Sequence, residues 1–427
     1  MTFTIESLGC AKNQVDSEEL IAHLERAGLA WVPEAQAADA LVVNTCGFIQ
    51  SAKEESIRTA LELKARYPGK RVIVAGCLVA RYGAELQQAL TELDGFVGLR
   101  DAAGIRRILL PDADDSPRSA EPRRRRFLSY PGSAYVKVAE GCDNRCSYCA
   151  IPLIRGPLAS RPLPEIVAEV QALVAQNVQE VILIAQDLAA YGAEQKAGGR
   201  LPELLRELLR LPGGFWLRCL YIHPDHFPEE LPELAAADPR LLPYFDLPFQ
   251  HAAREVLQRM GRRGSAAGYL GLVRRIRARL PQAVLRSTFL VGFPGETEEH
   301  FQSLLDFQRE AALDWVGAFA FSREEGTAAH AFTPRVNART AAARKRALER
   351  AQTPITEARL ERQVGRELEV LVEEPVQGES LALGRAYLQA PEVDGLVVVK
   401  AGGLEAGSRV RVRIERRNGV DLEGSLV

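Results

Sequence analysis

Three cysteines within eight residues constrain this chain more than any other feature. Cys142, Cys146 and Cys149, here called the central triad, are separated by three and then two residues and follow a strand-like run that ends at Val138. The loop that carries them, Asp143–Tyr148, is polar, which argues against three cysteines buried in an apolar core. The spacing therefore predicts ligands of a metal centre.

Zinc is the first alternative for the central triad. A structural zinc site closes with four ligands, and no fourth cysteine or histidine follows nearby. A [4Fe–4S] cluster held by three thiolates leaves one iron without a protein ligand. That iron can chelate the amino and carboxylate groups of S-adenosylmethionine, whose reductive cleavage releases a 5′-deoxyadenosyl radical. With Tyr148 directly before the last cysteine, the spacing resembles the signature of the radical S-adenosylmethionine superfamily.

The N-terminal part of the chain alternates strand-like and helix-like segments. The strand-like segments are Phe3–Leu8, Leu41–Asn44 and Arg71–Ala75, and the helix-like ones are Ser17–Arg26 and Ser51–Ala65. This alternation is typical of βαβ units and predicts an open parallel α/β sheet. In such sheets, sites form beyond the carboxyl ends of the strands.

A cysteine follows each of these three strands: Cys10, Cys46 and Cys77, here called the N-terminal triad. A single cysteine in such a place is more often a small buried hydrophobic residue. Three at one edge of one sheet can converge on a point, which predicts a second cluster with an open iron. Cys219 lies inside a strand-like segment, Trp216–Ile222, without such a partner, and we expect it in the core.

The rest of the chain divides into a longer alternating part and a valine-rich end. The longer part has six strand candidates: Ala134–Val138, Val181–Ile184, Trp216–Ile222, Tyr244–Leu247, Leu285–Val291 and Trp315–Phe321. They predict a full or partial (TIM-like) β/α barrel with its site at the carboxyl ends of the strands. Leu396–Lys400 and Val410–Ile414 predict a small antiparallel β barrel. The predicted units are 1–118, a polar linker at 119–132 that contains a run of arginines, 133–360 and 361–427.

Two further segments support a cofactor pocket beside Tyr148. Gln186 and Asp187 follow the second barrel strand, although an aspartate there is also a common helix cap. Gly292-Phe-Pro-Gly-Glu296 ends another strand with glycines that allow close approach of a ligand, and an ordinary turn explains it equally well. Both segments fit the way in which the superfamily holds the ribose and methionine parts of its cofactor.

The motifs together resemble those of the methylthiotransferases. They are Gly9-Cys-Ala-Lys-Asn-Gln-Val-Asp-Ser-Glu18, Asn44-Thr-Cys-Gly-Phe48, Ala75-Gly-Cys77, Gly141–Pro152, Arg155-Gly156 with Ser160-Arg161, Gln186-Asp187 with Tyr191-Gly192, and Asp246–His251. The resemblance spans all three units. It implies an N-terminal domain with an auxiliary [4Fe–4S] cluster, a radical barrel and a C-terminal TRAM domain.

Two subclasses of this family differ in substrate. One modifies an adenosine of tRNA, and the other modifies the β-carbon of an aspartate in protein twelve of the small ribosomal subunit. Leu-Gly-Cys-Ala-Lys-Asn at 8–13 and Cys-Ala-Ile-Pro at 149–152 resemble the ribosomal-protein subclass, whereas the tRNA subclass usually has Gly-Cys-Gln-Met-Asn at the first site. A tRNA substrate and a non-catalytic electron carrier remain as alternatives.

Charge in the C-terminal unit favours the protein substrate. From residue 367 onward, eleven acids and seven bases give a net charge of −4. An RNA-binding module needs a basic surface, whereas an acidic one suits a basic ribosomal protein. The alternative is that the charges only keep the domain in solution, and the basic stripe Arg409–Arg417 weakens an argument from net charge alone.

The resemblance implies that S-adenosylmethionine is used twice. One molecule methylates sulfur at the open iron of the N-terminal triad's cluster, and a second is cleaved at the central triad's cluster with an electron from an external donor. His251 and Arg155 are candidates for orienting the substrate carboxylate, although either fits a structural role. The sequence has no basic and then apolar start and no membrane-length apolar run, so we expect a cytoplasmic enzyme without a membrane partner.

Overall fold

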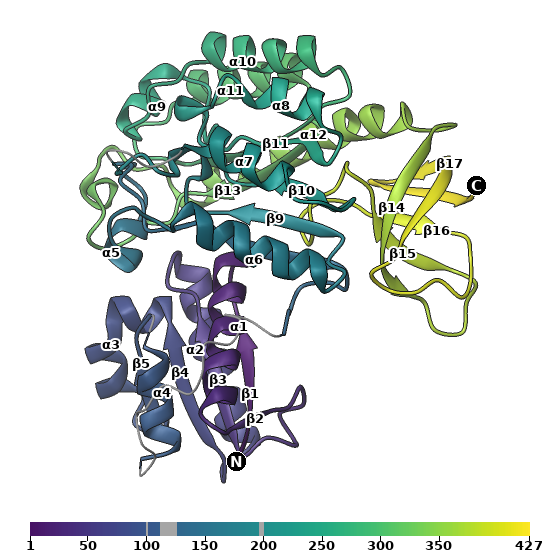
Figure 1. Ribbon diagram of the computed structural model, residues 1–427. Helices are drawn as coiled ribbons and strands as arrows, with labels where there is room; N and C mark the ends of the chain where they lie inside the picture. The colour runs from purple at the N-terminus through teal and green to yellow at the C-terminus, as the bar shows by residue number, and fades with distance from the viewer. Residues whose placement is uncertain (100, 112–125, 196–199) are drawn as a thin grey trace.

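The computed structural model describes residues 1–99, 101–111, 126–195 and 200–427. Figure 1 shows an N-terminal sheet below, a larger partial barrel above it, and a small C-terminal barrel at the side. The first part of the predicted linker, residues 119–125, lies outside the described ranges, and so does the arginine run except for Arg126. Of the helices described, none has both the length and the apolar character needed to cross a membrane.

The N-terminal unit is a parallel sheet in the order β2-β1-β3-β4-β5. Its strands are β1 (Thr2–Ser7), β2 (Ala30–Trp31), β3 (Ala40–Thr45), β4 (Arg71–Gly76) and β5 (Gly95–Val97). Helices α1 (Ala11–Arg26) and α4 (Ala102–Leu109) cover one face, and α2 (Gln50–Arg66) and α3 (Cys77–Ala89) cover the other. The strands are apolar on both sides because both faces are covered by helices.

Helix α1 begins at Ala11, six residues before the expected start at Ser17. The prediction was wrong because no Ser, Thr, Asp or Asn precedes this start to mark it. Gly9 turns the chain with a φ of +96°, and Cys10 occupies the N-cap position without a capping side-chain hydrogen bond. The earlier start places Lys12 and Asn13 in the first turn of α1.

Six parallel strands form the partial barrel in the order β13-β12-β11-β10-β9-β6, and this sheet is not closed. The strands are β6 (Ser133–Lys137), β9 (Glu180–Ile184), β10 (Trp216–Cys219), β11 (Leu241–Asp246), β12 (Val284–Val291) and β13 (Trp315–Ala320). The helices are α5 (Ile151–Arg155), α6 (Leu163–Ala175), α7 (Leu201–Leu209), α8 (Leu231–Ala237), α9 (Arg254–Arg259), α10 (Ala266–Arg279), α11 (Glu298–Ala311) and α12 (Ala338–Glu361). A short ribbon of β7 (Ala139–Glu140) and β8 (Ala159–Ser160) flanks the loop of the central triad.

Strand β10 ends at Cys219, three residues earlier than expected. The chain leaves the sheet because Tyr221 adopts a left-handed backbone with a φ of +63°, which a side-chain-bearing residue rarely does. Asp246 holds this turn by accepting a hydrogen bond from the Tyr221 N–H at 3.1 Å. Cys219 itself is buried in the core, as expected.

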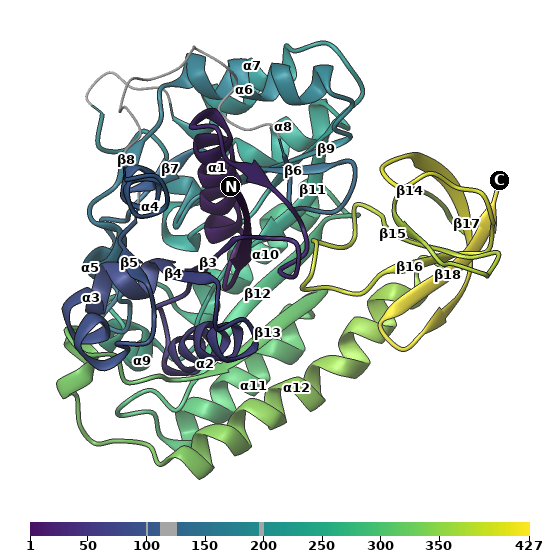
Figure 2. The same ribbon diagram turned by 90° about the horizontal axis from the view of Figure 1, so that it is seen from below.

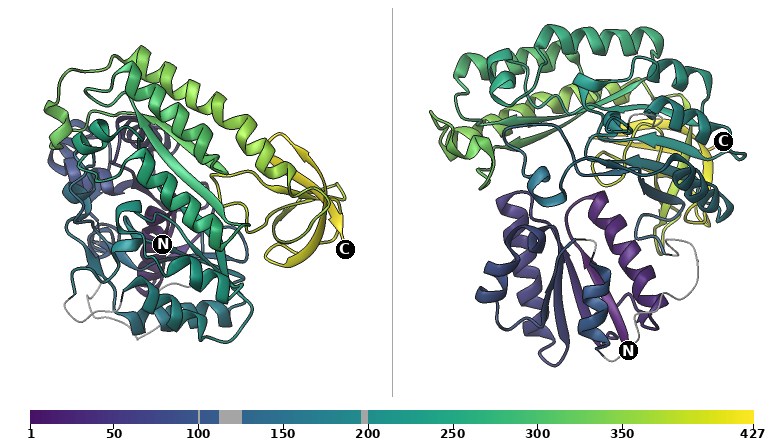
Figure 3. Two further views of the ribbon diagram at one scale, coloured as in Figure 1. Left: turned by 90° about the horizontal axis from the view of Figure 1, so that it is seen from above. Right: turned by 60° about the vertical axis from the view of Figure 1, so that its left-hand side comes forward.

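The C-terminal unit is a closed barrel in the order β14-β15-β16-β18-β17. Its strands are β14 (Glu367–Pro375), β15 (Ala382–Arg385), β16 (Val397–Val399), β17 (Arg409–Asn418) and β18 (Asp421–Leu426). The predicted fold class is confirmed, with one refinement: β16 and β18 pair in parallel, while the other pairs are antiparallel. Figure 3 shows α12 running along the partial barrel into this unit.

The two faces of the partial barrel pack against different partners. Alternate strand residues such as Val136 and Leu183 face the surrounding helices. The residues between them, such as Tyr135 and Ile182, form one apolar cluster with the C-terminal barrel and with Val15 of α1. Figure 2 shows α1 lying against the barrel from below. Helix α1 is therefore part of the lining of the barrel mouth.

Candidate active site

The loops after β1, β3 and β4 bring the N-terminal triad together. These strands are neighbours in one parallel sheet, so their carboxyl ends meet at one edge. A Cβ on Gly9 would lie 2.8 Å from the Cβ of Cys46, which shows how closely the first two loops approach. The charges of Cys10 and Cys46 both act on the thiol of Cys77. The three cysteines therefore lie close together at one edge of the sheet, as the positions of the strand ends predict.

The central triad lies in the loop between β7 and α5, at the mouth of the partial barrel. The N–H of Cys142 donates to Gly156 O at 3.1 Å, and the N–H of Cys149 donates to Cys146 O at 3.1 Å. All three cysteines line a cavity of about 580 Å³, and the segment 326–328 lines it as well. Three thiols therefore face one space that is large enough for a cluster.

Sulfur spacing argues against a single zinc ion at either triad. In the described ranges, no three cysteine sulfurs all lie within 4.8 Å of one another. Tetrahedral zinc with bonds of about 2.3 Å would hold its sulfurs about 3.8 Å apart. Burial raises the pKa of Cys142 to about 11 and that of Cys149 to about 12, so metal binding must release these protons. Both triads fit a larger inorganic core better than a lone ion.

A buried arginine lies beside each triad. The positive charge of Arg262 acts on Cys146 and Cys149, and its guanidinium donates to Tyr148 Oη at 3.3 Å. Arg155 donates to the Sγ of Cys77 at 3.2 Å. A cation close to thiolates favours their charged form, so these two arginines stabilise the state that binds metal.

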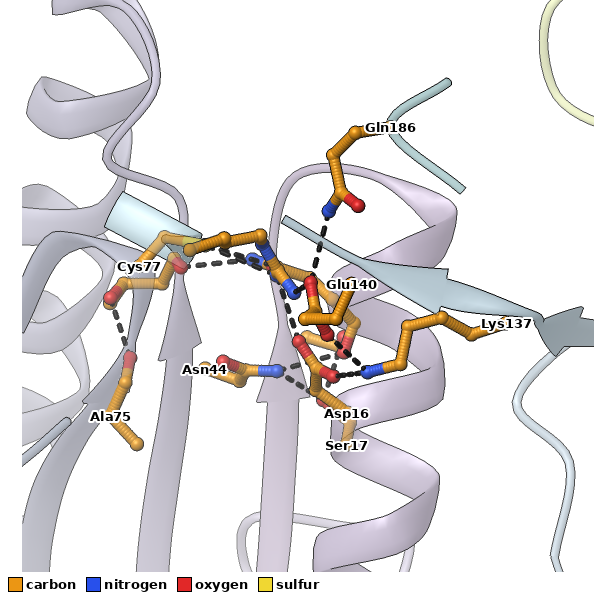
Figure 4. A network of polar contacts seen from close by, with 12 residues as sticks. Asp16, Ser17, Asn44, Ala75, Cys77, Lys137, Glu140 and Gln186 are labelled. Carbon is orange, nitrogen blue, oxygen red and sulfur yellow. Dashed lines mark hydrogen bonds and ion pairs between the residues drawn. The ribbon is translucent and has the colours of Figure 1, made fainter. Parts of the chain in front are cut away.

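Arg155 also joins the N-terminal sheet to the barrel. Its guanidinium donates to Asp16 at 2.8 Å, Glu140 at 2.7 Å and Asn13 at 2.6 Å. Figure 4 shows Asp16 and Glu140 of this network beside Lys137. Lys137 pairs with the same two carboxylates, and Asp16 is its shorter contact. Because these groups are largely removed from water, the network fixes how the two units face each other.

Replacing Arg155 by methionine is expected to cost about 2 kcal/mol of unfolding free energy. The loss is below the 3–5 kcal/mol typical of breaking a buried ion pair because Lys137 still neutralises both carboxylates. Urea denaturation of the metal-free protein measures it. Arg309→Met is the control, since its pair with Asp306 is exposed and should be worth under about 1 kcal/mol. Equal effects of the two variants would contradict the assignment.

Asp187 follows β9 at its carboxyl end, as predicted, and it also caps a helix, which was the alternative role. Its carboxylate accepts from the Ala189 N–H at 3.0 Å, which caps the short 3₁₀ helix Leu188–Ala190. The other oxygen accepts from Asn144 of the central loop at 2.8 Å and contacts His226 Nδ1 at 3.0 Å. Asp187 thus ties β9 to the loop of the central triad, next to a second cavity of about 790 Å³.

The other predicted cofactor residues fall into two groups. Tyr148 contacts Arg262. The half-buried Gln186 donates to Glu140 at 3.0 Å, whereas its enclosed Oε1 has no hydrogen bond in the described ranges, which fits a ligand that donates to it. Gly292 and Glu296 instead serve the fold. A Cβ on Gly292 would lie 2.4 Å from Ala341 Cβ, and the Glu296 carboxylate accepts from the N–H groups of its own turn. Their cofactor role stays a prediction.

The two candidates for orienting the substrate carboxylate have internal partners. Arg155 is taken up by the network described above. His251 is fully buried, accepts from the Ala253 N–H at 3.0 Å, and lies 3.9 Å from Glu296. Neither is placed as an open anion-binding group.

Sequence reasoning missed Lys12, Tyr221 and Arg262. Arg262 lies far from the central triad in the sequence, so no spacing marks it. Tyr221 follows a barrel strand at its carboxyl end, which is a usable signal. Lys12 has a cationic Nζ 3.3 Å from the centroid of the Tyr221 ring, and burial lowers its pKa to about 8.

An open parallel barrel with three clustered cysteines at its mouth is the architecture of radical S-adenosylmethionine enzymes. The family described as "Radical SAM superfamily" matches residues 136–307, "Uncharacterized protein family UPF0004" matches 2–98, and "TRAM domain" matches 364–427. Members of this superfamily use S-adenosylmethionine and a [4Fe–4S] cluster.

Similar chains sharpen this class to one family. A protein of Treponema denticola is 41% identical over 98% of this chain and 99% of its own length, and one of Moorella thermoacetica is 44% identical over 96% and 95%. A protein of Carboxydothermus hydrogenoformans is 39% identical over the whole of both chains. All three are named ribosomal protein uS12 methylthiotransferase RimO. The chain belongs to this family of methylthiotransferases, and the resemblance to the ribosomal-protein subclass is confirmed.

Solved structures support the fold. The radical S-adenosylmethionine methyltransferase TsrM from Kitasatospora setae, with cobalamin and a [4Fe–4S] cluster bound, aligns with a TM-score of 0.56 at 17% identity. The alignment covers 76% of this chain and 72% of that one. At this identity the likeness shows a shared fold alone.

Proposed function

We propose that this chain inserts a methylthio group at the β-carbon of an aspartate in ribosomal protein uS12. The observation that carries the proposal is the arrangement of two cysteine triads on facing units, joined by Arg155, in a chain that matches uS12 methylthiotransferases over its full length. We expect the enzyme to act in the cytoplasm, where ribosomes are modified.

The cysteines are proposed as ligands of two clusters. When bound, a [4Fe–4S] cluster on the central triad with S-adenosylmethionine supplies a radical that removes hydrogen, and one on the N-terminal triad supplies the methylated sulfur. Arg155 and Arg262 hold positive charge against the two sets of thiolates. The Asp16–Arg155–Glu140 network keeps both sites at a fixed separation, as a reaction between two bound groups requires.

Ion pairing in the C-terminal barrel supports a protein substrate over tRNA. The basic stripe of β17 presents little free charge, because four of its five arginines face a glutamate. The pairs are Arg409–Glu369, Arg413–Glu367, Arg416–Glu423 and Arg417–Glu357. Phosphates are bound by unneutralised lysines and arginines, so this surface is poorly suited to RNA.

Incubation of the reconstituted enzyme with uS12, S-adenosylmethionine and dithionite is expected to raise the mass of uS12 by about 46 Da, the difference between a methylthio group and hydrogen. Intact-protein mass spectrometry measures the gain, and tRNA hydrolysed after the same incubation is the control. A methylthio nucleoside with unchanged uS12 would replace the proposal by the tRNA alternative. The absence of 5′-deoxyadenosine would favour an electron carrier.

A further inference from the structure

Lys12 is a buried cation without an anionic partner. Its side chain is on the first turn of α1 and the residue is only 8% exposed. No hydrogen bond or ion pair connects its Nζ to any other described residue, and its close neighbour is the ring of Tyr221. A cation–π contact offsets only part of the cost of taking an ammonium out of water. The Nζ itself is not fully enclosed, so an anion can reach it.

Other buried basic groups nearby are already paired. Lys137 lies between Asp16 and Glu140. Arg286 lies 3.1 Å from Asp246 and 3.4 Å from Asp394. The charge of Asp246 also acts on Lys12, but its oxygens are engaged by Arg286 and by the N–H of Tyr221. Lys12 differs from these groups in having its Nζ available.

The backbone around Tyr221 holds the tyrosine ring in place beneath the Lys12 ammonium, and this ring is here called the platform of Lys12. Left-handed geometry at a tyrosine is costly and persists only where the surroundings impose it. Here Asp246 fixes the N–H of Tyr221, and Tyr221 O accepts from the Leu188 N–H at 2.9 Å. The ring thereby faces the first turn of α1, at the carboxyl end of β10 where a barrel enzyme places its substrate.

The placement of Lys12 suits a group held between the two triads. Lys12 is two residues from Cys10, and the charges of Cys10 and Arg155 both act on it. The sulfurs of the N-terminal triad already have a cation in Arg155, which donates to Cys77. The Nζ of Lys12 instead lies over Tyr221, a residue of the barrel mouth.

Resting on the proposed function, we propose that the Lys12 ammonium binds the side-chain carboxylate of the substrate aspartate. The carboxyl carbon is bonded directly to the β-carbon, so holding the carboxylate fixes the carbon that reacts. The Tyr221 ring limits the approach of the carboxylate to the open side of the ammonium. Recognition of a charged group at a buried site also rejects the neutral asparagine.

Binding of two uS12 peptides to the full-length reconstituted enzyme tests this role. The peptides span the modified position and differ only in carrying aspartate or asparagine there, and fluorescence anisotropy at one fixed pH gives both Kd values. The wild type should favour aspartate by about tenfold to hundredfold, as expected for a hydrogen bond to a charged group. In Lys12→Met the ratio should fall to about one, and Lys12→Arg should restore part of it.

Iron content and 5′-deoxyadenosine formation are measured on the same samples and should match the wild type in Lys12→Met. Lys345→Met, which removes an exposed lysine paired with Glu349, is the matched control. Lys12→Gln gives the same test if the methionine variant does not fold.

Four outcomes would overturn the proposal. An unchanged aspartate-to-asparagine ratio in the Lys12 variants, with the wild type still adding about 46 Da to uS12, removes the role of Lys12 and leaves the proposed function standing. Loss of iron in Lys12→Met assigns Lys12 to the cluster, and loss of 5′-deoxyadenosine formation with full iron assigns it to S-adenosylmethionine. A wild type that neither binds nor modifies uS12 removes both proposals.

Discussion

Cys77→Ala is expected to abolish methylthio transfer to uS12 while keeping cleavage of S-adenosylmethionine, whereas Cys149→Ala is expected to abolish both. The two residues belong to triads on different units, so each substitution removes one cluster. Iron should fall from about eight to about four atoms per chain in either variant. The two variants should then have the same iron content and differ in the cleavage of S-adenosylmethionine. Only Cys149→Ala should lose this cleavage, because the central triad lines the cavity at the barrel mouth.

Cys219→Ala is the matched control for both variants. Cys219, the last residue of β10, is buried in the core cluster between the sheet and its helices, so the Cys219→Ala variant should keep all of the iron. Iron and sulfide analysis, electron paramagnetic resonance of the reduced protein and chromatography of 5′-deoxyadenosine give the readouts. Full iron in Cys77→Ala would contradict a cluster at the N-terminal triad. Retained cleavage in Cys149→Ala would contradict the assignment of the central triad.

The general placement of both triads follows from the sequence because it depends on local order alone. Each cysteine of the N-terminal triad directly follows a strand, and parallel neighbouring strands end at one edge. The central triad is contained in one loop, so its spacing needs no knowledge of the fold. Topology and motif spacing are therefore sufficient to locate the two proposed cluster sites.

The surroundings of the triads could not be predicted in this way. Arg262 reaches Tyr148 only because α9 is followed by a turn that packs beside the central loop. The contact between Lys12 and Tyr221 requires that α1 begins at Ala11, where no capping residue marks a helix start. It also requires a left-handed backbone at Tyr221, and both features depend on contacts between distant segments. Charge partners at a site are long-range properties of packing, and local propensity does not encode them.

A buried carboxylate holds the partial barrel and the C-terminal barrel together, and the spacing of residues in the sequence does not reveal it either. Glu180, at the start of β9, is fully buried between two arginines. Its oxygens accept from Arg218 at 2.7 Å and from Arg385 of the C-terminal barrel at 2.7 Å. Arg218 in turn donates to Tyr387 O at 3.1 Å. Glu180 thus neutralises part of the charge of both arginines, and without it each would lose a buried anionic partner.

Glu180→Gln is expected to lower the unfolding free energy by about 3 kcal/mol at pH 7, because removing one partner leaves buried charge uncompensated. Burial alone would raise the pKa of Glu180, but Arg385 and Arg218 lower it to about 2, against about 4.3 in an unfolded chain. The stabilisation is therefore fully present above about pH 4.3 and is lost as the pH falls towards about 2.

Urea denaturation of the metal-free wild type and variant at a series of pH values tests this sign. The difference between them should stay near 3 kcal/mol from about pH 7 to 5 and shrink below about pH 4, because protonated Glu180 and glutamine are both neutral. Glu367→Gln, which breaks a more exposed pair with Arg413, should cost under about 1 kcal/mol. A difference that grows on acidification would mean that Glu180 is already protonated in the native protein and that Arg218 and Arg385 are neutralised by other groups.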